Sequence, residues 1–222
     1  MDNNDMKHTF SNFTVNSSNV NAYREAIEFS LKHDNDRIIV KGPTGCGKSH
    51  LIESIFQNFT SSYKDLPCIR YDIHSLTKEI KNGLDFAKLE NMLNSSLIVI
   101  DDIDCVDKGL YGYLAKLFKK LIEHNNKIVL SVTNTDRLNT VIKNEFRIVE
   151  IFQPNNELFK SYLDRYLFNN NLVFEREAKD YLINNYSKDF RSFLGSLSRL
   201  EYYLIANNKN KVNFNLIKTI FE

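Results

Sequence analysis

Short apolar runs alternate with longer amphipathic stretches over the first 153 residues. The runs are rich in isoleucine, valine and leucine, which is typical of strands buried on both faces of a parallel sheet. The stretches between them place apolar residues at helical spacing. This alternation predicts an α/β fold with a doubly wound parallel sheet. The predicted strands are 37–41, 67–71, 96–100, 127–134 and 147–152, and the predicted helices are about 20–32, 48–59, 74–81, 85–93 and 110–124.

The pattern changes at Pro154. Beyond this proline the apolar residues recur at helical spacing, and no apolar run of the earlier kind follows. We therefore predict two domains, an α/β core over residues 1–153 and a small helical domain over residues 154–222. The helices predicted in the second domain cover about 155–169, 175–186, 189–206 and 213–221.

Composition narrows the class of protein. Of 222 residues, 42% are hydrophobic and 26% are charged, which indicates a soluble globular chain. The net charge of +1 provides no strong field toward nucleic acid or a membrane surface, so we expect neither direct DNA binding nor membrane attachment. Three scattered cysteines, without a C-x-x-C pair, favour a reducing, cytoplasmic location.

A glycine-rich loop follows the first predicted strand and leads into a helix. It matches G-x-x-x-x-G-K-[ST], the pattern of a loop that holds phosphates. Its glycines let backbone N–H groups curl round an anion, and the helix that follows directs its positive end at the same place. Lys48 is expected to reach the β- and γ-phosphates, and the hydroxyl of Ser49 is expected to bind Mg²⁺. The loop residues predicted to bind nucleotide are Gly42, Pro43, Thr44, Gly45, Cys46, Gly47, Lys48 and Ser49.

Two carboxylates come directly after the predicted strand at 96–100. Asp101 is placed to hold Mg²⁺ beside Ser49, and Asp102 is placed to orient an attacking water. The strand at 127–134 also ends in polar groups, and either Thr133 or Asn134 is a candidate to contact the γ-phosphate or the water; a plain turn is the alternative. We expect ATP or ADP with Mg²⁺ as the ligand, and no other metal.

These motifs together resemble an AAA+ ATPase, and within that class the DnaA family. The stretch Thr9-Phe-Ser-Asn-Phe-Thr-Val15 resembles the N-terminal segment that lines the base side of the nucleotide, which implies roles for Phe13 and Val15. Gly47-Lys-Ser-His-Leu51 resembles the family's G-K-[ST]-H-L, which adds His50 to the site. Ile100-Asp-Asp-Ile103 resembles its I-D-D-I, so Asp102 stands where most AAA+ proteins have glutamate. The stretch at 189–197 resembles the sensor-2 region and implies that Arg191 lies near the phosphates.

Within the family, the pattern is similar to Hda-like regulators, which have the AAA+ core and lid without a helix-turn-helix DNA-binding domain. That resemblance implies DnaA as partner, through contact between AAA+ domains, and the sliding clamp as a further one. Two features depart from it. The first residues hold no clamp-binding sequence of the Q-L-x-L-F kind, and Glu145 stands where the family's arginine finger would be, with Arg137 and Arg147 out of register. A helicase loader or another nucleic-acid remodelling ATPase is the alternative function, and a DNA-binding initiator fragment is a third.

Overall fold

The structure is a computed structural model, and it describes residues 8–83, 85–186 and 189–221. These residues divide into two compact units. The first holds the chain up to Phe13, Asn19–Pro43 and Gly47–Ile151. The second holds Thr14–Ser18, Thr44–Cys46 and the chain from Phe152 onward. The division into domains over 1–153 and 154–222 stays a prediction.

The first unit is built on five parallel strands in the order β2-β3-β4-β1-β5. The strands are short, and the central strands β3 and β4 are mostly apolar and buried along nearly their whole length. Parallel strands of this kind need helices on both faces of the sheet. The strands are β1 (Arg37–Lys41), β2 (Cys68–Asp72), β3 (Leu97–Asp101), β4 (Lys127–Val132) and β5 (Arg147–Glu150).

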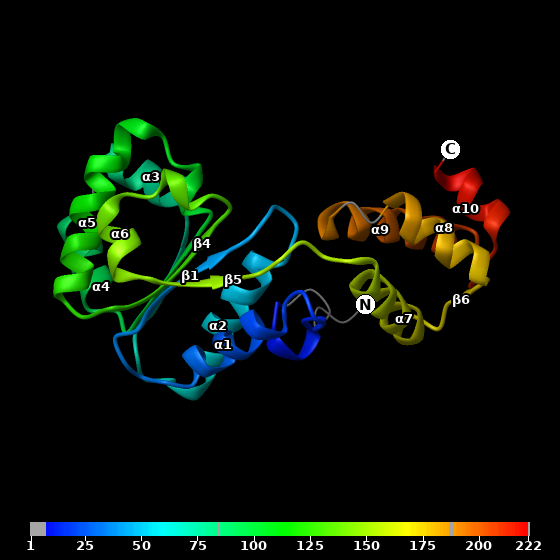
Figure 1. Ribbon diagram of the computed structural model, residues 1–222, viewed down its shortest axis with the longest axis horizontal. Coiled ribbons are helices and arrows are strands. Elements are labelled where there is room, and N and C mark those ends of the chain that lie inside the picture. Colours follow the sequence, from blue (N-terminus) through cyan, green and yellow to red (C-terminus); the bar gives the residue numbers. More distant parts are fainter. Residues whose placement is uncertain (1–7, 84, 187–188, 222) are drawn as a thin grey trace. The chain divides into compact units, whose positions relative to one another are not determined.

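Helices cover the two faces of this sheet (Figure 1). On one face, Ile39 and Leu130 pack in a core with residues of α3, α4, α5 and α6. Successive strand residues point to opposite faces, so Ile38 and Val40 face α1 and α2. The helices are α1 (Val20–Ser30), α2 (Lys48–Ser62), α3 (Ile73–Lys81), α4 (Phe86–Leu93), α5 (Tyr111–Glu123) and α6 (Thr140–Glu145). The predicted doubly wound α/β sheet is confirmed.

The second unit is a helical bundle with its own core. Phe159, Leu182 and Phe193 are among its buried residues and come from three different helices. Its helices are α7 (Asn156–Asn169), α8 (Arg176–Tyr186), α9 (Phe190–Ala206) and α10 (Phe214–Phe221), which agree with the predicted ranges to within a residue at each end. The prediction missed one feature, a parallel pairing of β6 (Val173–Phe174) with β7 (Lys211–Val212). Two residues are too few to show a strand period in a sequence.

No helix among the described residues has the length and apolarity needed to cross a membrane.

Candidate functional site

The glycine loop lies between β1 and α2, as predicted, and its backbone requires glycine at two positions. Gly45 has φ +75° and Gly47 has φ +105°, in the left-handed region that side chains rarely adopt. A Cβ on Gly47 would also lie 3.2 Å from the Phe13 ring. The loop is therefore a tight cradle of backbone that a larger residue would fill, which is the form that a phosphate-binding loop takes.

Lys48 begins α2 and folds back into this loop. Its side chain is almost fully buried, with 6% of the residue exposed. Nζ donates to the carbonyl oxygens of Gly42 at 2.9 Å and Pro43 at 3.0 Å, and to Oγ1 of Thr133 at 3.1 Å. An ammonium has three protons to donate, so these three acceptors hold the cation in one place. The loop thus carries a fixed positive charge.

The two acids at the end of β3 are anchored by β4. The hydroxyl of Ser131 hydrogen-bonds to Oδ1 of Asp101 and accepts the N–H of Asp102 at 2.8 Å. Ser131 is fully buried in the middle of an apolar strand, so these bonds satisfy a hydroxyl that would otherwise be costly there. Sequence reasoning missed Ser131, although one polar residue inside the run Ile-Val-Leu-Ser-Val was a usable signal.

Asp102 has an unusual backbone. It adopts φ 52° and ψ 41°, the left-handed conformation, which residues other than glycine enter at a cost of about 1–3 kcal/mol. The chain turns there from β3 into the short 3₁₀ helix η2 (Ile103–Cys105). Strained residues of this kind cluster at functional sites, so the backbone adds a structural reason to consider Asp102 a site residue.

The end of β4 presents two polar residues that behave differently. The hydroxyl of Thr133 contacts Lys48, as described above. The side-chain oxygen of Asn134 instead accepts the N–H of Asp136 at 2.8 Å and caps the 3₁₀ helix η4 (Thr135–Arg137). The sequence left two uses open for these residues, a contact at the phosphate site and a plain turn. Thr133 contacts Lys48, and the side chain of Asn134 is part of a turn. The role predicted for Asn134 stays a prediction.

The N-terminal segment packs beside the first turn of α2. The buried ring of Phe13 stacks on Tyr23 with centroids 5.7 Å apart and meets His50 edge to face at 5.0 Å. Nε2 of His50 lies 3.0 Å from the carbonyl oxygen of Thr9 and 3.0 Å from Oδ1 of Asn12. Phe13 and His50 therefore support the loop from one side. Val15 is exposed and belongs to the second unit.

Within the second unit, the tip of the glycine loop meets the start of α9. The N–H of Phe190 donates to the carbonyl oxygen of Gly45 at 3.1 Å. A Cβ on Gly45 would lie 2.8 Å from Cβ of Asp189, which is a second reason for glycine there.

Asp189 is the N-cap of α9. The N–H of Ser192 donates to the Asp189 carboxylate and, with the Ser192 hydroxyl, lowers the pKa of that carboxylate. Arg191 follows it, exposed, in the first turn of α9. Thr44 is exposed and Cys46 is buried.

The position expected for an arginine finger holds a glutamate, and two arginines lie near it in the sequence. Glu145 is exposed at the last residue of α6. Arg147, at the start of β5, forms ion pairs with Glu25 and with Asp36, the latter at 3.1 Å. Arg137 is exposed in η4, on the chain segment that follows β4. Thus a carboxylate stands at the matching position, and the nearest arginine is engaged with acids of its own chain.

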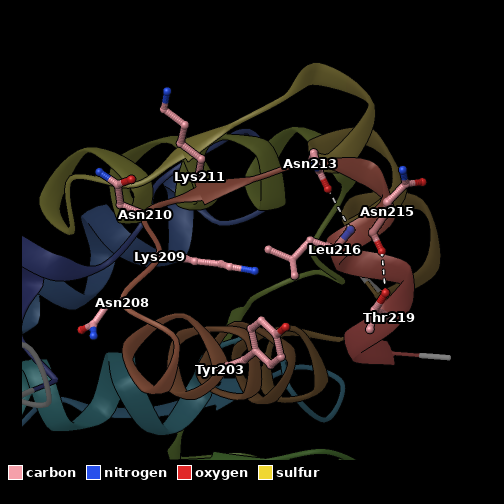
Figure 2. Close-up of a pocket in the computed structure, with 9 residues that line it drawn as sticks. All are labelled: Tyr203, Asn208, Lys209, Asn210, Lys211, Asn213, Asn215, Leu216 and Thr219. Atoms are coloured by element: carbon pink, nitrogen blue, oxygen red, sulfur yellow. Dashed lines mark hydrogen bonds between the residues drawn. The ribbon is translucent and has the colours of Figure 1, made fainter.

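A hollow of about 570 Å³ lies elsewhere in the second unit (Figure 2). Lys209 extends into it, while Lys211 points outward. Its wall includes Asn213, whose side-chain oxygen accepts the N–H of Leu216 at 2.9 Å. The lining holds no carboxylate that could ligate magnesium and no glycine loop, so it does not share the chemistry of the site at Lys48.

The five-stranded parallel sheet and its glycine loop define an α/β core of the P-loop type, with a helical C-terminal unit. The model of the bacterial DnaA ATPase domain matches residues 4–152. The chain belongs to this DnaA family of AAA+ domains, and the resemblance to that family recognised in the sequence is confirmed.

Relatives and solved structures agree with this assignment. The chain is similar to the chromosomal replication initiator DnaA of Buchnera aphidicola, at 25% identity over 96% of this chain and 52% of that protein. It is similar to DnaA of Mycoplasma capricolum at 24% identity over 93% and 50%. The chain thus spans about half the length of these relatives.

Two solved structures show the same fold. Domain III of Thermotoga maritima DnaA aligns with a TM-score of 0.84 at 21% identity, over 97% of this chain and 96% of that one. AMPPCP-bound DnaA from Aquifex aeolicus aligns with a TM-score of 0.73 at 21% identity, over 88% and 65%.

Proposed function

We propose that this chain binds a magnesium–adenine nucleotide, ATP or ADP, at the glycine loop. The observation that carries the proposal is the buried Lys48 ammonium, held inside a loop whose backbone requires Gly45 and Gly47. A fixed cation and a curved backbone are what a triphosphate needs. AMPPCP bound to Aquifex aeolicus DnaA, a structure of the same fold, supports the choice of nucleotide.

Different residues of the site would hold the phosphates, the magnesium and the base. Backbone N–H groups of residues 44–47 and the start of α2 would receive the phosphates, and Lys48 would neutralise their charge. Ser49 and Asp101 are the residues that would hold Mg²⁺, and Ser131 keeps the Asp101 carboxylate in position. The magnesium would supply additional charge neutralisation at the phosphate oxygens. Asp102, Asn134 and Arg191 are proposed to act near the γ-phosphate, and Phe13, Val15 and His50 on the base side.

Replacing Asp101 with asparagine is expected to remove most of the magnesium dependence of nucleotide binding. The parent should bind ATP more tightly with Mg²⁺ than with EDTA, by about tenfold or more, because a carboxylate ligand contributes charge as well as an oxygen. In the variant, the two affinities should approach each other. Calorimetric titration with and without Mg²⁺ measures both.

Asp107→Asn is the control for the Asp101 variant. Asp107 lies in the same part of the chain but pairs with Lys81 at the surface, with Oδ2 and Nζ 3.0 Å apart. It should retain the full magnesium effect. If Asp101→Asn also retains it, Asp101 is not a magnesium ligand.

We further propose that the chain regulates initiation of DNA replication through contact with DnaA, as Hda-like members of the family do. Support comes from Glu145, which puts a carboxylate where self-assembly would need a cation, and from Arg147, which is paired with Glu25 and Asp36. A second copy of this chain would present Glu145 at that position, whereas DnaA proteins of the family present an arginine there. Affinity capture of the tagged chain from its native cell, probed for DnaA and for the sliding clamp, tests the choice of partner.

A further inference from the structure

Asp104 is a buried carboxylate next to the candidate site. It lies in η2, three residues after Asp101, and is only 4% exposed. Its Oδ2 accepts the N–H of Thr133 at 3.1 Å and the N–H of Asn134 at 2.8 Å. Its Oδ1 is buried as well, and no group among the described residues hydrogen-bonds to it.

The two N–H groups that Asp104 receives lie just past the end of β4, which finishes at Val132. Beyond that residue the sheet no longer provides partners for these N–H groups, and the buried Asp104 carboxylate accepts both of them instead. A carboxylate that accepts both N–H groups forms charge-assisted bonds, which are stronger than neutral ones. Asp104 therefore fixes the backbone of this turn to the segment that carries Asp101 and Asp102.

The position of this turn matters because of Thr133. Its Oγ1 lies 3.1 Å from Nζ of Lys48, the cation expected at the β- and γ-phosphates. Thr133 is thus held from two sides, through its backbone by Asp104 and through its hydroxyl by Lys48. Packing alone does not favour aspartate here, because Oδ1 of Asp104 is buried with no hydrogen-bond partner in the described part of the chain, which is destabilising.

We propose that Asp104 is a positioning residue that holds Thr133 beside Lys48, so that hydroxyl and ammonium meet the γ-phosphate together. This inference rests on the proposed nucleotide binding and deepens it. Only ATP has a γ-phosphate, so Asp104 sets how well the site distinguishes ATP from ADP. It acts through Thr133 and does not itself touch the nucleotide.

Amide hydrogen exchange in the nucleotide-free protein tests the two hydrogen bonds from Thr133 and Asn134 to Asp104 directly. In Asp104→Ala, the Thr133 and Asn134 amides should exchange about ten- to a hundredfold faster, the loss expected for bonds to a charged acceptor. Asp104→Asn keeps an oxygen that can accept both N–H groups and should recover part of the protection. Asp107→Ala, an exposed acid nearby, should change nothing at these amides. If the two amides in Asp104→Ala exchange as slowly as in the parent, the inference is wrong. If Asp104→Ala does not fold, Asp104→Asn decides, because it removes the charge and keeps an acceptor oxygen. Unchanged exchange in Asp104→Asn would show that the negative charge of Asp104 does not strengthen these hydrogen bonds.

The affinities for ATP and for ADP test the proposed effect of Asp104 on the discrimination between these nucleotides. Asp104→Ala should lose about tenfold in affinity for ATP while its affinity for ADP stays near that of the parent, and Asp104→Asn should restore part of the difference. An equal loss for both nucleotides indicates a merely structural role and contradicts the assignment. A parent that binds neither nucleotide would overturn the proposed function and the discrimination between nucleotides with it, whereas the exchange experiment would still decide whether Asp104 braces the turn.

Discussion

Replacing Lys48 with alanine is expected to lower the affinity for ATP and for ADP by about a hundredfold, because the variant loses charge-assisted bonds to the phosphates. The fold should persist. The groups that Lys48 contacts in the free protein are two loop carbonyls and one hydroxyl, so losing them should cost only about 1–3 kcal/mol of the free energy of unfolding. Calorimetry measures the affinity, and thermal unfolding measures the stability.

Lys41→Ala is the matched control for this variant. Lys41 ends β1, directly before the glycine loop, and carries the same charge. Its ammonium pairs with Glu150, with Nζ and Oε1 2.9 Å apart, at a partly exposed position. The control should therefore bind nucleotide like the parent. Unchanged binding by Lys48→Ala would show that the glycine loop does not hold the phosphates.

The purified chain is expected to hydrolyse ATP slowly, at a rate per molecule that does not rise with protein concentration. Self-assembled AAA+ proteins need an arginine from a neighbour, which contributes about 10³–10⁵ in rate where such fingers act. Glu145 is exposed at the matching position and would repel a neighbour's γ-phosphate. Asp102 is also one methylene shorter than the usual glutamate. Steady-state hydrolysis, measured over a range of protein concentrations, tests this expectation.

Glu145→Arg converts the repulsive group into a cation and should make turnover faster and dependent on concentration. Glu123→Arg is the control, because Glu123 is also an exposed glutamate at the last residue of a helix, α5. It makes the same change of charge away from the expected finger position and should leave the rate low. Brisk, concentration-dependent hydrolysis by the parent would favour the remodelling ATPase, the alternative function, over the regulator.

The sequence was sufficient for those parts of the site that depend on neighbours along the chain. The loop from Gly42 to Ser49 is a local motif, and its strand and helix could be recognised from apolar spacing on either side. The carboxyl ends of parallel strands meet at one edge of a sheet, so Asp101 and Thr133 could be expected near each other before their contacts were known.

The contacts between residues far apart in the sequence, which hold the site together, could not be predicted from the sequence. Ser131 reaches Asp101 across 30 positions of sequence, and Asp104 reaches Thr133 across 29, so only the strand register brings each pair together. Asn134 had two possible uses, and the structure shows its side-chain oxygen in a turn, a choice that depends on one rotamer. The left-handed backbone of Asp102 likewise has no signal in residue type alone.

Direct binding between the purified chain and purified DnaA from the same cell tests whether the chain acts through DnaA. We expect a complex that forms with MgATP, weakens when nucleotide is removed, and fails to form with Lys48→Ala. Lys41→Ala should bind DnaA like the parent. Absence of a complex with DnaA, under conditions where the chain is shown to bind MgATP, would contradict the proposed role as a regulator of DnaA.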